Sequence, residues 1–188
     1  MFKYRKKELV IITFLLALVL VSTYFIYYKF KNSTDIKYDS DTLDVTFHGD
    51  KGDRVDFYKV TPVTDSVGLS SKEYSFTIKN NTNKTLEYSI NIVDNNEFIQ
   101  EDYCKDTQIP KNIIKFSIRN EKEDNSIYAL NNLINGNVLT RKIKPRDKEK
   151  YTMRFWTTRD TNISTGTKLH YHGIIEVVDL GNKVAINY

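Results

Sequence analysis

The sequence predicts an all-β protein, an antiparallel β-sandwich of the Ig-like or jelly-roll kind, preceded by one N-terminal transmembrane helix. Three observations lead to this expectation. One long uncharged apolar run lies near the N-terminus, and after it apolar and polar residues alternate over short segments. Clusters of turn residues separate these segments, and none has the spacing of a long amphipathic helix. A closed β-barrel is the alternative arrangement of such strands.

The apolar run covers residues 9–28, LVIITFLLALVLVSTYFIYY, which is about the length that an α-helix needs to cross a bilayer. A basic segment, residues 1–8, comes before it and favours a cytoplasmic N-terminus. We therefore expect a single-pass protein of the cell membrane whose helix contacts lipid and whose C-terminal part is extracytoplasmic. Because no Ala-x-Ala site follows the run, an uncleaved signal anchor is favoured over a cleaved signal peptide, which stays the alternative.

The charge balance supports this division. The chain carries 28 Lys and Arg against 24 Asp and Glu, and removing residues 1–8 leaves 24 against 23. The outer part is thus nearly neutral, which argues against a nucleic-acid partner. Cys104 is the only cysteine, so no disulfide can form within the chain. It is a buried small hydrophobe, a free thiol or an intermolecular link.

Residues 29–41 are polar and without periodicity, and we interpret them as a stalk. The extracytoplasmic domain then covers residues 42–188. Its first strand alternates Leu43, Val45 and Phe47 with polar residues. Further strands are expected at residues 55–58, 74–78, 86–92, 113–119, 138–143, 150–157 and 169–178, with an edge strand at 184–187.

Residues 73–94 are expected to form a hairpin of the strands at 74–78 and 86–92, because turn-forming Asn80-Asn81-Thr82-Asn83 lies between them. Residues 94–111 break the alternation and form either a crossover between sheets or a functional loop. Residues 126–134 have apolar residues near helical spacing, which indicates a short helix or a loop over the sheet edge.

The three histidines are the candidates for a metal site. His170 and His172 lie on one face of a strand, and His48 could complete an open zinc site. Their face also carries charged residues, so solvated histidines are the favoured interpretation. Asp50, Asp53 and Asp56 likewise favour a solvated turn over a calcium site. No motif of a catalytic site is present, so we expect a protein that is not an enzyme and needs no cofactor.

Two features are candidates for binding. Trp156, the only tryptophan, falls on the outward face of its strand beside Arg154, where an exposed tryptophan would be an interaction hot spot. A Trp156 covered by the segment that begins at Asp94 or by a neighbouring strand is the favoured interpretation. At the C-terminus, Val184, Ile186 and Tyr188 belong to a β-prone segment that either completes its own sheet or adds to a neighbouring chain by self-association.

Several packing and turn patterns together resemble the exported β-sandwich proteins of low-GC Gram-positive bacteria, loosely those of the camelysin and TasA group. The patterns are TPVTDSVGL before YSFTIKNNTNKTLEYSINIVD, then IP before IIKFSI, and IKP before YTMRFWTTRD and HGIIEVVD. The resemblance covers residues 42–179 and implies an extracytoplasmic sandwich that in some members forms fibres. It also implies a peptidase of the camelysin kind as the alternative function, although no ligand motif carries that activity over.

These observations together predict a membrane-anchored extracytoplasmic module at the cell surface. It would bind another protein or a component of the cell envelope without catalysing a reaction. The alternative is a metal-dependent hydrolase that uses His48, His170 and His172. The sequence does not name the partner.

Overall fold

The computed structural model describes residues 6–31, 35–49, 51–58, 61–95, 108–121, 125–159, 163, 169–181 and 184–185. The chain divides into two compact units, Met1–Asp35 and Ile36–Tyr188. Cys104, Asp50, Ile186 and Tyr188 lie outside the described residues.

The first unit contains one helix, α1 (Lys6–Lys31). Its segment Glu8–Tyr27 has a mean hydropathy of 2.7 and buries none of its length within the protein. The hydroxyls of Thr13, Ser22 and Thr23 donate to backbone carbonyls about one turn earlier in the helix, so these polar groups are satisfied without water. The predicted helix is confirmed, and it is long and apolar enough to span a membrane.

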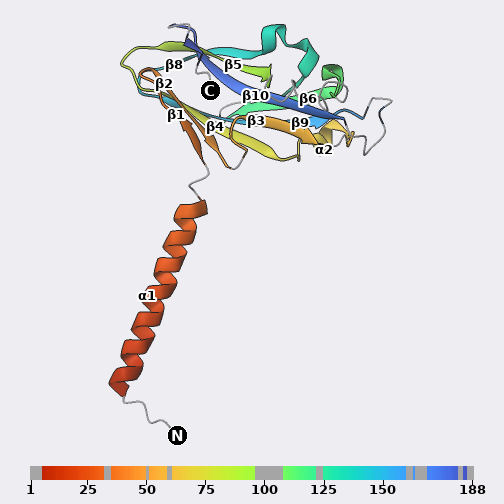
Figure 1. Ribbon diagram of the computed structural model, residues 1–188. Helices are drawn as coiled ribbons and strands as arrows, with labels where there is room; N and C mark the ends of the chain where they lie inside the picture. The colour runs from red at the N-terminus through yellow and green to blue at the C-terminus, as the bar shows by residue number, and fades with distance from the viewer. Residues whose placement is uncertain are drawn as a thin grey trace. The chain divides into compact units, whose positions relative to one another are not determined.

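The second unit consists of two antiparallel β-sheets, and Figure 1 shows them as two layers. The first sheet has the strand order β1-β2-β4-β9-β6-β7, and the second has the order β11-β10-β5-β8, with β3 also paired to β10. The strands of the first sheet are β1 (Ile36–Tyr38), β2 (Leu43–His48), β4 (Glu73–Asn80), β9 (Lys148–Thr157), β6 (Ile114–Asn120) and β7 (Ser126–Ala129). Those of the second are β3 (Arg54–Tyr58), β5 (Leu86–Asp94), β8 (Asn137–Ile143), β10 (His170–Asp179) and β11 (Val184–Ala185).

The two sheets share one apolar core. Alternate side chains of each strand face inward, as period-two patterning requires, and form a single buried cluster. Phe57 of the second sheet meets Phe155 of the first with ring centroids 6.4 Å apart. The hydroxyls of Tyr88 and Tyr151 lie 2.6 Å apart across the same interface. The all-β antiparallel prediction is therefore confirmed, and the described strands form two separate sheets.

The predicted hairpin of residues 73–94 is wrong. Both strands form, but β4 belongs to the first sheet and β5 to the second, so their connection is an arch over the edge of the core. Asn80 directs it: its amide nitrogen donates to the carbonyls of Lys84 at 2.7 Å and Lys144 at 3.0 Å. Because both strands bury one face in the same core, their alternation is the same in an arch as in a hairpin.

The predicted stalk is also wrong in part, because Ile36–Tyr38 forms β1 at the edge of the first sheet. The ring of Tyr38 packs edge-on against Phe47 with centroids 6.0 Å apart. Three residues are too few for alternation to indicate a strand. The folded domain thus begins at Ile36 rather than at Thr42.

Short helical turns lie in several of the connections between strands. Residues 126–134 hold the edge strand β7, the 3₁₀ turn η2 (Leu130–Asn132) and the start of η3 (Ile134–Gly136), and no α-helix. The segment 94–111 crosses from β5 in the second sheet to β6 in the first, through the 3₁₀ turn η1 (Lys111–Ile113), as its crossover interpretation predicts. One further short helix, α2 (Asp65–Gly68), precedes β4.

Candidate functional site

Trp156 is buried, as the favoured covered interpretation predicts, and the alternative of an exposed hot spot is wrong. Only 3% of it is exposed, and its indole Nε1 donates to Asp65 Oδ1 at 3.1 Å. The helix α2 covers the ring, with Gly68 against the indole because a side chain would not fit there. Arg154 pairs with Glu73 at 2.7 Å and donates to the carbonyl of Ser71. This face is therefore part of the packing, and Trp156 has no free surface for a partner.

The predicted histidine cluster does not assemble. His48 lies on β2 of the first sheet, where its Nε2 is 2.9 Å from Thr77 Oγ1. His170 and His172 lie on β10 of the second sheet and are buried, so the solvated interpretation is wrong. His172 Nδ1 is 2.8 Å from Asp56 Oδ1. Within the described part of the chain, no three His, Cys, Asp or Glu side chains could hold a metal ion.

The acidic turn is likewise not simply solvated. Asp56 faces His172 directly across the β3–β10 pairing, and Asp53 is buried. Burial raises the pKa of Asp53, against the opposing effect of hydrogen bonds and the nearby Arg54. Both carboxylates thus have protein partners and serve the packing of β3.

The C-terminal segment pairs with its own domain. Val184 and Ala185 form β11 beside Val178 and Asp179 of β10. This is the self-completing arrangement among the two that the sequence left open. Strand addition to a neighbouring chain by the residues after Ala185 stays a prediction.

The pocket that stands out lies at one end of the domain, between the last residues of β5 and the turns η1, η2 and η3. It encloses about 370 Å³. Its lining comes from both sheets: Ile92, Val93, Asp94, Lys111, Leu130, Asn131, Leu133, Asn135, Gly136 and Tyr171. We call this cavity the end pocket. None of its lining side chains was among the binding or metal-site candidates predicted from the sequence.

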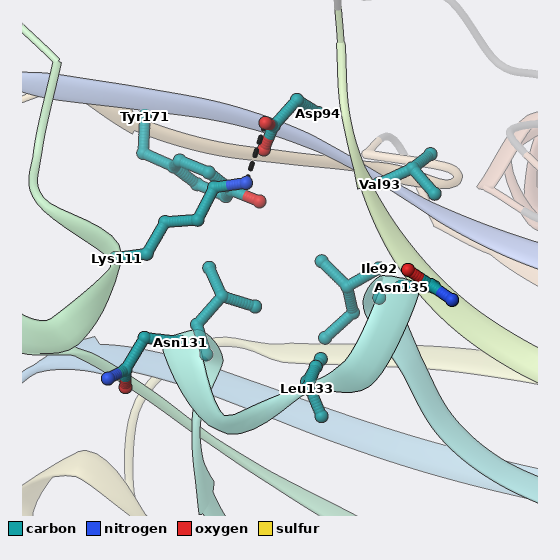
Figure 2. A pocket seen from close by; sticks show the side chains of 10 residues that line it. Ile92, Val93, Asp94, Lys111, Asn131, Leu133, Asn135 and Tyr171 are labelled. Carbon is teal, nitrogen blue, oxygen red and sulfur yellow. Dashed lines mark hydrogen bonds and ion pairs between the residues drawn. The ribbon is translucent and has the colours of Figure 1, made fainter.

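Three polar groups meet at one side of the end pocket. The Lys111 ammonium lies 2.6 Å from Asp94 Oδ2, so this ion pair joins η1 to the end of β5. The hydroxyl of Tyr171 is directed to the same place, as Figure 2 shows. Burial, followed by the negative charge of Asp94 and a hydrogen bond to its carboxylate, raises the pKa of Tyr171 above its ordinary value. The phenol is therefore protonated at neutral pH and is a potential donor.

The backbone pairing of two strands explains this convergence. Asp94 is the register partner of Gly173 across β5 and β10. A Cβ at Gly173 would lie 2.7 Å from the Tyr171 hydroxyl, so the missing side chain leaves room for the phenol to fold over this position. Gly173 thereby lets Tyr171, two residues earlier on the same strand face, reach toward Asp94.

The opposite side of the end pocket is apolar. Ile92 and Leu133 point into it in Figure 2, and Leu130 also lines it. The turn η3 closes this side, with Asn135 at φ 52° and Gly136 at φ 74°. A side chain at Gly136 would overlap the carbonyl oxygen of Ile92, so glycine is required there on two counts. The pocket therefore combines an apolar floor with a polar end, as ligand sites commonly do.

A signal for this site does exist in the sequence. Asp94 and Lys111 carry opposite charges at the two ends of the segment 94–111. A functional loop was one of the two interpretations of this segment, beside a crossover between the sheets. Tyr171 lies in the strand expected at 169–178, where it alternates with the histidines, and that pattern does not show where its hydroxyl points. The lining residues from η2 and η3 could not be predicted from the sequence, because they join the pocket only once the strand order of the two sheets is known.

Comparison with known proteins adds no relative. No family model, no curated protein and no solved structure matches this chain. The resemblance to camelysin and TasA proteins thus stays a prediction.

Proposed function

We propose that this protein is a membrane-anchored, non-enzymatic binding module whose ligand enters the end pocket. Helix α1 serves as an uncleaved anchor with a cytoplasmic N-terminus, and Ile36–Tyr188 is an extracytoplasmic sandwich of the Ig-like or jelly-roll kind. The partner belongs to the cell envelope, as the resemblance to Gram-positive surface proteins implies. The observation that carries the proposal is the meeting of Asp94, Lys111 and Tyr171 above an apolar floor.

The arrangement favours binding over chemistry. Lys111 and Asp94 neutralise each other at 2.6 Å, and the Tyr171 phenol has a raised pKa, so none of the three is activated as a nucleophile. The metal-dependent alternative needs His48 beside His170 and His172, and His48 belongs to the other sheet. We therefore do not pursue the hydrolase as a second function.

Topology is tested by protease treatment of intact protoplasts that express the full chain. We expect degradation of residues 36–188, protection of the N-terminal segment, and a membrane-bound protein of full length before treatment. Release of a fragment that begins near Tyr24 would contradict the anchor and indicate secretion.

Binding at the end pocket is tested with a photoreactive amino acid at position 133 in the same cells. We expect a crosslinked product that disappears with the additional substitution Asp94→Asn. Position 67 is the matched control, because Val67 is exposed on α2, away from the pocket lining. Equal products from positions 67 and 133, or a product at 133 that is insensitive to Asp94→Asn, would contradict binding in the pocket.

A further inference from the structure

The edge strand β7 belongs to the longest uncharged run of the chain after helix α1. Residues 125–140 form β7, the turns η2 and η3 and the first part of β8, and they include no Asp, Glu, Lys or Arg. Charged residues make up 28% of the whole chain, so this run differs from its surroundings. A segment without charge is typical of the centre of a protein–protein interface, where charged residues are depleted.

The uncharged run also exposes large apolar side chains. Ile127 and Tyr128 of β7 are 41% and 39% exposed, and Ile134 is 81% exposed. The ring of Tyr128 stacks on Phe116 of β6 with centroids 5.4 Å apart, so one face of the ring belongs to the core and the rest is open. Exposed apolar side chains gathered in one uncharged segment indicate a surface for a partner.

The backbone of β7 is open to another strand. It pairs with β6 over Ser126–Ala129, and within the described residues no strand pairs with its other side. Edge strands are commonly protected from further pairing by charged side chains, lysine above all. The edge strands β1, β3 and β8 carry Lys37, Arg54 and Lys142, whereas β7 carries no charge. Among these four edge strands, β7 is therefore the one without this protection.

Charge and symmetry favour a second copy of the chain as the partner. Two identical edges can pair antiparallel across a two-fold axis, which brings each side chain next to itself or to a near neighbour. Such pairing at β1 or β8 would bring lysines together, whereas at β7 it joins Ile127 and Tyr128 to uncharged residues only. Because α1 is long and apolar enough to span a membrane, copies in one membrane would also meet at a raised effective concentration.

From these observations we infer that two copies of this chain associate through β7, whose strands pair antiparallel and join the first sheets of both copies. The two-fold axis continues each face of the sheet, so Ile127 lies opposite either Ile127 or Ala129 of the second copy. On the core side, Tyr128 correspondingly lies opposite Ser126 or Tyr128 of the second copy. This association goes beyond the proposed function and requires no ligand in the end pocket.

Sedimentation equilibrium of the full chain in detergent micelles tests the association. We expect a reversible monomer–dimer equilibrium for the unaltered chain. Ile127→Lys and Ile127→Glu should each weaken it about tenfold or more, because like charges would then lie opposite or diagonal across the pairing. An equal mixture of the two variants should recover dimers, since unlike charges then face each other. Val67→Lys places the same charge on an exposed residue of α2 and should dimerise as the unaltered chain does.

Cysteine pairs locate the strand and its register. In chains that carry Cys104→Ser, mild oxidation should link Ile127→Cys either to itself or to Ala129→Cys, according to the register. Val67→Cys should give no linked dimer. Tryptophan fluorescence controls for folding, because the buried emission of Trp156 should be the same in every variant.

Four results would overturn the inference. They are a monomer at every concentration, dimers of Ile127→Lys as tight as those of the unaltered chain, a mixture of Ile127→Lys and Ile127→Glu that dimerises no better than either variant alone, and the absence of both cysteine links. Dimers that persist in Ile127→Lys would place the contact in α1 or on another surface. The proposed ligand of the end pocket is unaffected by each of these outcomes, since its test depends on Asp94.

Discussion

The surroundings of Trp156 show how single residues close the outer face of the first sheet. Its indole N–H donates to Asp65, whose carboxylate also accepts from Lys115 at 3.0 Å. The hydrogen bond from Lys115 holds the pKa of Asp65 below its usual value. Gly68 lies against the ring, where a Cβ would overlap it. One glycine and one carboxylate thus determine whether the tryptophan is buried.

Substitution of Gly68 tests this packing. Gly68→Ala should destabilise the domain by about 1–3 kcal/mol, because the added methyl must displace the indole. Since Trp156 is the sole tryptophan, its emission should shift to longer wavelength. Urea unfolding followed by tryptophan fluorescence measures both effects. Val67→Ala, at an exposed neighbour, should leave both within about 0.5 kcal/mol and unshifted. Unchanged emission in Gly68→Ala would mean that α2 does not cover the ring.

A second residue cluster makes stability depend on alkaline pH. Tyr88 donates to Glu149 Oε2 at 2.6 Å and Tyr151 donates to the same atom at 2.7 Å. Burial raises the pKa of Tyr88 and raises that of Tyr151 to about 12. Because both folded pKa values exceed the unfolded value near 10, their contribution is complete below pH 10 and is lost as the pH rises toward 12.

We expect the free energy of unfolding in urea to fall between pH 9 and pH 12. The Tyr88→Phe variant should be less stable at pH 8 but lose less stability over the same range, because one of the tyrosines with a raised pKa is gone. Tyr58→Phe, which changes an exposed tyrosine, should keep the original profile. Parallel profiles for all three proteins would exclude the cluster as the source of the pH dependence.

Among the elements, the two neighbouring arches do most to fix the topology. Asn80 links the β4–β5 arch to the β8–β9 arch, because its amide donates to the carbonyls of Ile143 and Lys144 as well as to that of Lys84. Its Oδ1 accepts from the backbone N–H of Thr82 at 2.8 Å. One fully buried side chain thus donates to carbonyls of both arches, beside the bonds that Lys84 accepts from the Thr82 hydroxyl and Lys144 from the Asp147 N–H.

Loss of Asn80 should therefore weaken both arches together. Asn80→Ala should cost about 1–3 kcal/mol, because it removes several hydrogen bonds of one buried side chain to both arches. Asn80→Asp should cost more, because its carboxylate would face the same carbonyl oxygens and cannot donate to them. Chemical unfolding measures the loss, with Asn132→Ala at an exposed position as the control. If Asn80→Asp were as stable as the unaltered chain, the amide would not be the group that joins the arches.

Local pattern predicted most strands but few of their neighbours. Alternation located β2, β4, β5, β6, β9 and β10, since each buries one face in the core. It did not distinguish an arch from a hairpin, which differ only in the sheet that receives the second strand. It also missed β1 and β7, which are three and four residues long. The end pocket depends on sheet pairing and on η turns, so its residues could not be assembled from pattern alone.

At the scale of the whole molecule, the boundary between the apolar helix and the β domain determines which strands close the first sheet. The domain unit starts at Ile36, because β1 pairs with β2 over Ile36–Tyr38. The Ile36 side chain lies where a Cβ of Gly52 would be, and Tyr38 packs on Phe47. The first strand after the helix is thus part of the first sheet rather than of a linker, and its Tyr38 packs on the core.

Two truncated chains test this boundary, one that begins at Asp35 and one that begins at Thr42. The longer chain should be more stable to urea by about 1–3 kcal/mol, because it keeps the partly buried side chain of Tyr38 on Phe47 and the pairing of β1 with β2. Both chains should show the same buried emission of Trp156, since α2 and β9 are present in each. An intermediate chain that begins at Asp35 and carries Tyr38→Ala should fall between them, which would assign part of the difference to this one ring. Equal stability of the chains that begin at Asp35 and Thr42 would instead restore residues 35–41 to the stalk and make β1 an incidental pairing.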